Sequence, residues 1–164
     1  MSRVAIGLGS NIDEPLQQLA GALRQINAHP DVSLATPSRV YLSAPIGPQD
    51  QPDFHNAVVV ADTSMTPETL LQWLLDTELE LGRQRSRHWG ERCIDLDLLL
   101  FDDREIQTES LVVPHPRAHL RRFVLDPLTE LLGEDHVLPG RGTLRSLQAK
   151  CADQAIRVLC EFPQ

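Results

Sequence analysis

The chain has 164 residues, of which 41% are hydrophobic and 23% are charged, and this is the composition of an ordinary soluble domain. Its net charge of −8 argues against a nucleic-acid partner, because affinity for nucleic acid depends on neutralising phosphates. No stretch approaches the ~20 apolar residues of a transmembrane helix, and Gly7 and Gly9 interrupt the first apolar stretch too early for a signal peptide. We therefore expect no membrane association.

The three cysteines favour a reducing compartment. Cys93, Cys151 and Cys160 form neither a CxxC pair nor an even disulfide set, so we expect a cytoplasmic protein. No internal repeat, low-complexity tract or linker divides the sequence. Residues 1–164 are therefore expected to form a single domain.

The first part of the chain predicts a strand, a helix and two further strands. Residues 3–8, RVAIGL, predict a buried strand, because apolar residues follow Arg3. Pro15 suits the first turn of a helix that continues to about Ala28 with its leucines on one face. Residues 32–42 predict the second strand and residues 55–61 the third.

A proline-rich loop separates the second and third strands. It covers residues 43–53 and holds three prolines, and a loop of this length in a compact domain is usually functional. A helix is predicted over 67–82, because Thr66 is a favourable N-cap residue. Residues 83–92 then form a second loop, and residues 93–101 predict a fourth strand.

The predicted order is strand, helix, strand, strand, helix, strand, which is the βαββαβ order of the ferredoxin-like fold. We therefore expect an α+β protein with this core. A hairpin-like piece around 105–113, short helices through 117–132 and a C-terminal helix and strand are expected as additions to it. Because the fold hosts many unrelated functions, it does not indicate an activity.

The arginines are concentrated in two short windows. Of fifteen basic residues only Lys150 is a lysine. The windows contain Arg83, Arg85, Arg87 and Arg92, and then Arg117, Arg121 and Arg122. Guanidinium groups bind phosphate oxygens in pairs, so these windows in an acidic protein indicate a compact polyanion as ligand. The alternative is a solvated basic face that balances nearby acids.

Two aspartates, Asp95 and Asp97, interrupt the apolar fourth strand. Side chains two residues apart share one face of a strand, so these carboxylates stand side by side, ~6–7 Å apart at Cα. Leu99 and Phe101 are expected to follow on the same face and Leu100 on the opposite one, which puts the acids at the lip of a buried region. Two adjacent carboxylates suit Mg²⁺, and two such ions can clamp a phosphoryl group. The alternative is a strand with one face in water.

Other ligand-binding patterns are weak. There is no P-loop sequence, and GLGSN at residues 7–11 lacks the third glycine of a dinucleotide-binding fingerprint. His115 and His119 have the i, i+4 spacing of zinc ligands, but Pro116 disturbs a helix there and the pattern lacks a third ligand. The polyanion is therefore expected to be bound by metal and arginine.

The stretch HWGERCIDLDLL at residues 88–99 resembles the signature of the 6-hydroxymethyl-7,8-dihydropterin pyrophosphokinase family. Other segments resemble that family in the same order, namely AIGLGSN at 5–11, APIGPQDQPDFHN at 44–56, ELELGR at 78–83, VPH at 113–115 and RRF at 121–123. The resemblance spans about residues 4–132 and says nothing of residues 133–164. It implies an Mg²⁺-dependent transferase of folate biosynthesis, which we expect to be a monomer.

The resemblance also implies a mechanism and a set of residues. The hydroxymethyl oxygen of the pterin attacks the β-phosphorus of ATP, the pyrophosphoryl group is transferred whole, and AMP leaves. Asp95 and Asp97 are implied to hold two Mg²⁺ ions and, with Arg83 and Arg92, to be catalytic. The other residues implied to bind ATP are Glu78, Arg85, Leu98, His115 and Arg121.

The pterin is implied to lie between aromatic side chains. Phe54 and Phe123 match the stacking positions of the family, and Asn56 matches its hydrogen-bonding amide. The other residues implied to bind the pterin are Ser43, Ala44, Ile46, Trp89 and Asp95. For the two phenylalanines, the alternative is core packing, which is the commoner fate of this residue.

Some positions depart from the family. Leu75, Ser110 and Pro116 stand where the family often has glutamine, arginine and tyrosine, on the side expected to hold adenosine. Loop 83–92 is expected to act as a mobile lid that carries Trp89 over the pterin. The alternative is that Trp89 anchors the loop to the core.

Two other kinds of function are consistent with parts of the pattern. A small-molecule sensor, in which the aspartates only face water, predicts no Mg²⁺-dependent binding of ATP. Another D-x-D metal enzyme, such as a nucleotide-sugar transferase, leaves Phe54, Asn56 and the proline-rich loop unexplained.

Overall fold

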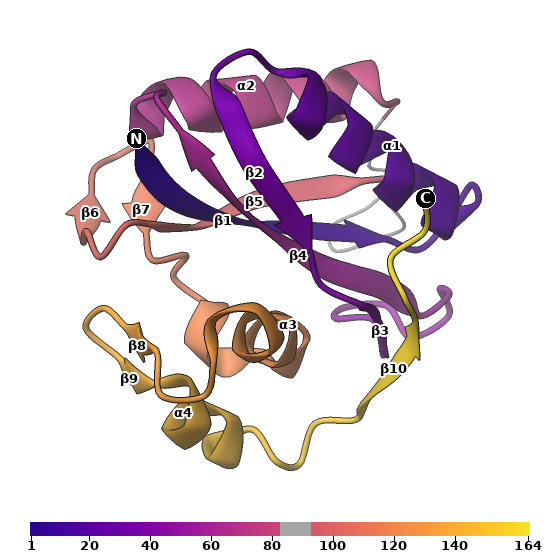
Figure 1. Cartoon of the computed structure of the whole chain (residues 1–164). Coiled ribbons are helices and arrows are strands. Elements are labelled where there is room, and N and C mark those ends of the chain that lie inside the picture. Colours follow the sequence, from indigo (N-terminus) through magenta and orange to yellow (C-terminus); the bar gives the residue numbers. More distant parts are fainter. Residues whose placement is uncertain (83–92) are drawn as a thin grey trace.

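The computed structural model describes residues 1–82 and 93–164. Within this part of the chain, six strands form an antiparallel sheet in the order β10-β3-β4-β1-β5, with β2 also paired to β4 (Figure 1). The strands are β1 (Ser2–Ser10), β2 (Val32–Pro37), β3 (Val40–Ser43), β4 (Phe54–Thr63), β5 (Asp95–Phe101) and β10 (Ile156–Cys160). Helices cover both faces of this sheet, so the protein is a mixed α/β protein with an antiparallel sheet.

One face of the sheet packs against α1 (Pro15–Ala28) and α2 (Pro67–Glu80). Both helices begin with a proline, Pro15 in α1 and Pro67 in α2. The side chain of Thr66 caps α2, as the sequence indicated, by accepting a hydrogen bond from the Thr69 amide at 3.2 Å. The core on this face includes the fully buried side chains of Leu19, Ile26, Leu70 and Leu74. Both predicted helices are confirmed, with α2 ending two residues early.

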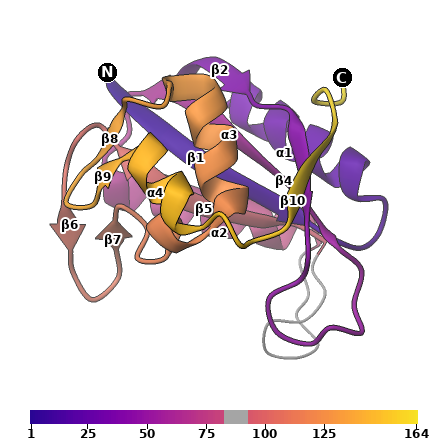
Figure 2. The same ribbon diagram turned by 90° about the horizontal axis from the view of Figure 1, so that it is seen from below.

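The opposite face is covered by a 3₁₀ turn, η1 (Ala118–Leu120), followed by α3 (Arg122–Leu132) and α4 (Leu144–Lys150), as Figure 2 shows. These elements enclose a second core, in which Leu125, Leu128 and Leu144 are fully buried. The expected helices after residue 117 and near the C-terminus are therefore present. These helices form the layer on the second face of the sheet, and β10 extends the sheet beside β3.

The second predicted strand is interrupted. The sequence predicted one strand over 32–42, but the structure has β2 and β3 with a break between them. Pro37 has no backbone N–H to continue the ladder. Ser38 bridges the break, because its amide donates to the Val58 carbonyl at 2.8 Å and its hydroxyl accepts from the Val58 amide at 3.0 Å. Both pieces therefore stay attached to β4.

The end of β5 contradicts one predicted side-chain pattern. Leu99 lies on the aspartate side, as expected, but a register shift opposite Ala5 and Ile6 moves the next residues to the other face. Leu100 packs in the core beside α3, and Phe101 packs in the core beside α1 and α2. A β-bulge inserts one residue in a strand and so reverses the alternation after it.

Two short hairpins complete the described chain, formed by β6 (Ile106–Gln107) with β7 (Val112–Val113) and by β8 (Val137–Leu138) with β9 (Gly142–Thr143). The first is the hairpin-like piece expected around 105–113. In the part of the chain that the structure describes, no helix has the length and apolar character needed to cross a membrane.

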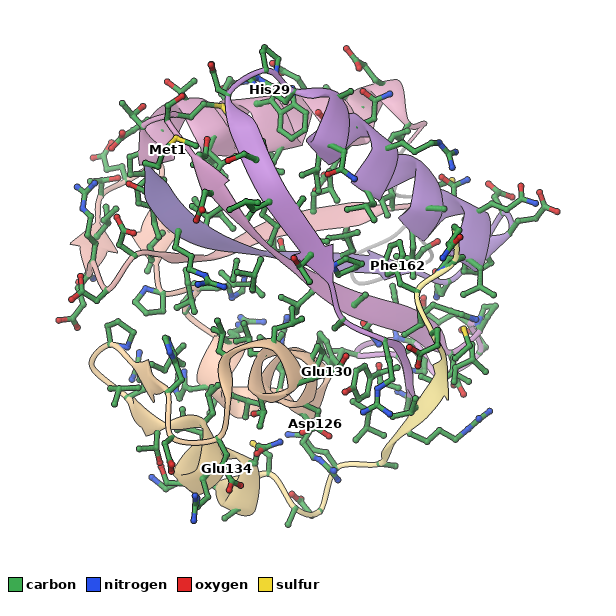
Figure 3. The ribbon with its side chains drawn as sticks, in the orientation of Figure 1. Met1, His29, Asp126, Glu130, Glu134 and Phe162 are labelled. Atoms are coloured by element: carbon green, nitrogen blue, oxygen red, sulfur yellow. The ribbon has the colours of Figure 1, made fainter. Side chains whose placement is uncertain are left out.

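Glu130 ties α3 to the sheet. Its carboxylate accepts a hydrogen bond from the Tyr41 hydroxyl at 2.6 Å and an amide hydrogen bond from Arg39 at 3.0 Å. The Arg39 side chain also pairs with it at 3.3 Å. In Figure 3, Glu130 and Asp126 both extend from α3, and they anchor the helix to different neighbours.

Candidate active site

Asp95 and Asp97 stand between two hollows of the protein surface. The first, which we call the central pocket, has a volume of about 80 Å³ and lies between the sheet and the start of α3. The second, the open pocket, has a volume of about 400 Å³ and lies between β5, α2 and the β6–β7 hairpin. Both aspartates line both hollows, so a ligand in either one lies against the same pair of carboxylates.

The floor of the central pocket is backbone. Gly7 pairs with Asp97 and Gly9 pairs with Asp95 across the β1–β5 ladder, so the two glycines share the face of the aspartates. A Cβ built on Gly7 would lie 3.3 Å from Leu99 Cδ1, and one on Gly9 would lie 3.6 Å from Asn56 Oδ1. Gly7 therefore makes room for the Leu99 side chain, and Gly9 leaves room for a ligand beside Asn56 and Phe54.

Asn56 lies on the other side of this floor and is buried. Its amide nitrogen donates to the Ser43 hydroxyl at 2.8 Å and to the Phe54 carbonyl at 3.2 Å. These bonds fix the amide plane and leave Oδ1 beside Gly9. A polar group held in this way can recognise the polar edge of a ring that enters the pocket.

Aromatic side chains close the central pocket. Phe54 comes from the start of β4 and Phe123 from the first turn of α3. The Arg121 guanidinium carbon lies 5.4 Å from the centre of the Phe123 ring, which is within the range of a cation–π contact. The structure thus brings together all the described residues that the resemblance implied for the pterin, namely Ser43, Ala44, Ile46, Phe54, Asn56, Asp95 and Phe123.

The proline-rich loop is held in place by its own amides. The Gln51 amide nitrogen donates to the Pro48 carbonyl at 2.9 Å, and its oxygen accepts from Asn11 at 2.9 Å. Asn11 also donates to the Pro52 carbonyl at 3.0 Å. These bonds connect the loop to the end of β1 and position the backbone of Ala44 and Ile46 at the pocket.

The open pocket contains three of the residues implied to bind ATP, Glu78, Leu98 and His115. Glu78 is buried, and its carboxylate accepts a hydrogen bond from the Leu96 amide at 2.8 Å, which joins α2 to β5. Arg121, the fourth described residue implied to bind ATP, lines the central pocket instead. The three departures from the family, Leu75, Ser110 and Pro116, also line the open pocket.

His115 is the one histidine beside the aspartates in the described residues of the two hollows. Burial lowers its pKa, and the nearby Arg121 and Arg117 lower it further, whereas the Asp97 carboxylate opposes them. The His115 amide donates to the Leu99 carbonyl at 3.0 Å, which holds this segment against the end of β5. The neutral imidazole is therefore favoured at this position.

Cys93 fixes the loop between β1 and α1. Its thiol donates to Asp13 Oδ2 at 3.0 Å, and the hydrogen bond to this carboxylate, with burial, raises the pKa of Cys93 to about 11. Asp13 and Glu14 both adopt positive φ, 56° and 60°, in the turn that leads into α1. All three cysteines, Cys93, Cys151 and Cys160, are free thiols.

Several predicted site residues fall outside the part of the chain that the structure describes. They are Arg83, Arg85, Arg92 and Trp89, together with the expected lid over residues 83–92. Among the described residues, no group of three or more His, Cys, Asp or Glu side chains is arranged to hold a metal ion. Asp95 and Asp97 are the two described carboxylates of the site that line both hollows.

The sequence did not single out every residue of the site. Val58 lines the central pocket as an apolar strand residue, and nothing in a strand pattern separates it from the core. Gln49 and Gln51 stabilise the loop beside the site, because their side-chain amides donate to the Pro45 and Pro48 carbonyls. Their position among prolines was a signal for this role, since buried loop carbonyls need hydrogen-bond donors.

Comparisons with known proteins point to one family. Residues 5–133 match the family described as 7,8-dihydro-6-hydroxymethylpterin-pyrophosphokinase (HPPK). The chain is similar to the 2-amino-4-hydroxy-6-hydroxymethyldihydropteridine pyrophosphokinase of Haemophilus influenzae, with 45% identity over 148 residues that cover 90% of this chain and 92% of the relative. It is 42% identical over 159 residues to the protein of the same name from Pseudomonas aeruginosa, covering 97% of this chain and 98% of the relative. The crystal structure of Plasmodium falciparum HPPK-DHPS wild type with SDX-DHP shares the fold, with a TM-score of 0.67 at 16% identity over 92% of this chain and 43% of that chain.

Proposed function

Because the chain belongs to the 7,8-dihydro-6-hydroxymethylpterin-pyrophosphokinase family, we propose that it transfers pyrophosphate from ATP to the hydroxymethyl group of 6-hydroxymethyl-7,8-dihydropterin in folate biosynthesis. AMP is the second product. The observation that carries this proposal is the position of Asp95 and Asp97 as the common wall of two hollows of different shape. A transfer between two bound substrates needs such a boundary.

The pterin occupies the central pocket. What supports this assignment is the narrowness of the pocket, its glycine floor and the two phenylalanines at its sides. A flat heterocycle fits between aromatic faces, and the fixed amide of Asn56 can bind the polar edge of the ring. Its hydroxymethyl group then points toward the aspartates.

The nucleotide occupies the open pocket. This hollow is larger, and Leu71, Leu75 and Val112 give it apolar walls suited to a purine. His115 lies at the end near the aspartates, so the triphosphate extends toward Asp95 and Asp97. The base is bound by apolar surface and backbone, because Leu75, Ser110 and Pro116 replace side chains that relatives can use.

Two Mg²⁺ ions are part of the proposal. The donor set fits them, since Asp95 and Asp97 offer hard carboxylate oxygens on one face of β5 and Asp97 is exposed. When bound, the ions supply charge neutralisation on the triphosphate and polarise the attacking oxygen. Asp95 and Asp97 are the residues that would hold them.

The protein's own contribution to the reaction is positioning and charge stabilisation. Phe54, Phe123 and Asn56 orient the pterin, and the backbone floor of β1 lets its ring lie close to β5. Arg121 faces the transferred group from the central pocket. We propose that Arg83 and Arg92, with Arg85 and Trp89, complete the site from the segment outside the described residues.

The proposal extends to the fold class and the state of the protein. The order of β1 to β5 with α1 and α2 supports the ferredoxin-like class for the core. We further propose that residues 1–164 act as a single-domain, monomeric enzyme in the cytoplasm. Gel filtration of the purified protein tests the oligomeric state.

The decisive experiment is identification of the nucleotide product. The protein is incubated with ATP, Mg²⁺ and 6-hydroxymethyl-7,8-dihydropterin, and the nucleotides are separated by chromatography. We expect AMP in a one-to-one ratio with pterin diphosphate, and no reaction when Mg²⁺ is chelated. ADP as the main product would mean attack at the γ-phosphorus. No turnover, together with no Mg²⁺-dependent binding of ATP in calorimetry, would favour the sensor.

A further inference from the structure

The chain beyond the matched family segment returns to the site. Residues 5–133 match the family, but the residues after them run along α3 and then pair with the sheet (Figure 2). In the β10–β3 ladder, Ile156 pairs with Ser43, which lines the central pocket. The residues just before β10 therefore lie beside the site, on the outer side of η1 and the start of α3.

Gln154 makes hydrogen bonds from this position to the backbone on both sides of Arg121. Its side-chain nitrogen donates to the Leu120 carbonyl at 2.7 Å, and its side-chain oxygen accepts from the Arg122 amide at 2.9 Å. These two groups belong to the two peptide bonds that flank Arg121. One side-chain amide thus pairs with Arg121 as a neighbouring β-strand would.

The start of α3 holds the carbonyl side of Arg121, because this carbonyl accepts from the Val124 and Leu125 amides, both at 3.0 Å. Arg121 is the N-cap residue of α3 and is extended, with φ −130° and ψ 114°, and its own side chain makes no capping hydrogen bond. The first amide of a helix has no partner within the helix. Gln154 supplies that partner from the tail, and its backbone carbonyl also accepts from Arg122 Nη1 at 2.9 Å.

Gln154 itself does not enter the central pocket. It lines a separate hollow of about 300 Å³ that shares Ser43, Arg121 and Phe123 with that pocket. Its hydrogen bonds therefore act on the backbone of residues 120–122 from outside the central pocket. The side chains of Arg121 and Phe123 line that pocket. A shift of this backbone turns both side chains relative to Asp95 and Asp97.

We propose that Gln154 is a positioning residue of the reaction, which holds the backbone of Arg121 so that its guanidinium faces the transferred pyrophosphoryl group. This inference rests on the proposed function for the role of Arg121, but the placement of Arg121 by Gln154 does not depend on it. The tail is thereby part of the active site, although it contributes no group to either hollow that holds a substrate.

The test compares Gln154→Leu with Gln148→Leu, which removes the same amide from the same tail. Gln148 donates to Asp126 Oδ1 at 2.9 Å, and among the described residues its side chain makes no hydrogen bond to the backbone of residues 120–122. Losing two hydrogen bonds at a positioned group should lower kcat about tenfold in Gln154→Leu, with KM for ATP changed less than about twofold. Gln148→Leu should keep kcat within about twofold of the wild type.

A double-mutant cycle separates positioning from general loosening. If Gln154 acts through Arg121, then Gln154→Leu should cost less than about twofold in kcat when Arg121 is already alanine. A loss that is the same in both backgrounds would overturn the proposal. Gln154→Glu keeps the acceptor for the Arg122 amide and loses the donor, so it should fall between the wild type and Gln154→Leu, and it replaces that variant if leucine prevents folding.

A spectroscopic measurement keeps the inference separate from the activity. The Nε–Hε signal of Arg121 in nitrogen-15 spectra should move in Gln154→Leu and stay in place in Gln148→Leu, and the Arg122 amide should lose hydrogen-exchange protection. Absence of AMP from the wild type would refute the proposed reaction alone. An unmoved Arg121 signal in Gln154→Leu would refute the positioning role whatever the reaction is.

Discussion

Asp95 and Asp97 differ in exposure although they share one face of β5. Asp95 is half-buried and Asp97 is exposed, and Leu99 on the same side is fully buried. The face therefore passes from solvent to core within five residues, as the sequence predicted when it placed the acids at the lip of a buried region.

Removal of either negative charge should stop the reaction without unfolding the protein. We expect Asp95→Asn and Asp97→Asn each to lower kcat by roughly two to three orders of magnitude, because the electrostatic contact to metal and phosphate is lost. The free energy of unfolding should change by less than about 0.5 kcal/mol for the exposed Asp97. Steady-state assays and denaturant unfolding measure both quantities.

Asp103→Asn is the matched control, since Asp103 is an exposed aspartate just after the far end of β5. It should behave as the wild type in both measurements. Near-normal turnover of Asp95→Asn or Asp97→Asn at saturating Mg²⁺ would contradict the proposal that these residues hold two metal ions.

Gly9 provides a second test at the scale of one residue. A Cβ at this position would lie 3.6 Å from Asn56 Oδ1 and 3.9 Å from Phe54 Cδ1, which are ordinary contacts, so Gly9→Ala should fold. The added methyl group occupies the floor of the central pocket. We expect pterin affinity, measured by calorimetry, to fall about tenfold or more, because overpacking typically costs about 1–3 kcal/mol.

The control for this variant is Gly21→Ala in α1, where a Cβ would meet Arg24 Nη2 at 3.6 Å and Leu81 at 4.0 Å among the described residues. It should leave both affinities unchanged and stabilise the protein by about 0.5–1 kcal/mol, as alanine does in a helix. Unaltered pterin affinity in Gly9→Ala would contradict the assignment of the pterin ring to the central pocket.

At the scale of elements, the contact between α3 and β3 rests on Tyr41 and Glu130. Burial, together with the hydrogen bond to the Glu130 carboxylate, raises the pKa of Tyr41 to about 12 from its usual 10.0. The unfolded chain loses the phenolic proton near pH 10, while the folded protein keeps it until about pH 12. The stabilisation is therefore complete below pH 10 and is lost as the pH rises through this window.

Tyr41→Phe should be less stable than the wild type by about 1 kcal/mol at neutral pH, because one hydrogen bond is removed. Between pH 10 and 12 the two proteins should converge, since only the wild type has this proton to lose. Urea unfolding at several pH values measures the difference. A gap that stays constant up to pH 12 would mean that the pKa of Tyr41 is not raised.

Elements with local signals were predicted well, and elements set by partners were not. Pro15 and Thr66 mark helix starts within the chain, and both helices begin there. The bulge that reverses Leu100 and Phe101 depends on the register against β1, which no pattern within β5 contains. The break after Pro37 is an exception, because it was missed although proline lacks the amide that a strand interior needs.

The site was predictable to different depths. The residue pattern alone indicated the aspartate pair and the arginine windows, while the residues around the pterin came from the family resemblance and gather at one pocket. Gln154 had no signal, since a lone glutamine after an acidic residue is typical of any surface turn. Its hydrogen bonds to the backbone of residues 120–122 exist only once α4 and β10 have packed.

At the scale of the whole molecule, two cores on opposite faces of one sheet position the site at a boundary. The core beside α1 and α2 fixes β5 and the aspartates, and the core beside α3 and α4 fixes Arg121 and Phe123. The geometry of the reaction therefore depends on both layers at once. A substitution that weakens packing in the core beside α3 and α4 should therefore reduce turnover at conditions where the sheet is still folded.

The position of β10 at the edge of the sheet also governs how the enzyme comes into being on the ribosome. A chain made from its N-terminus has produced β1 to β5 and α3 before Gln154 and β10 emerge. Until then β3 exposes an unpaired strand edge, which invites pairing with another nascent chain. The tail thus closes the edge and sets Arg121 in one late step, so a nascent enzyme gains protection from aggregation and full catalytic competence together.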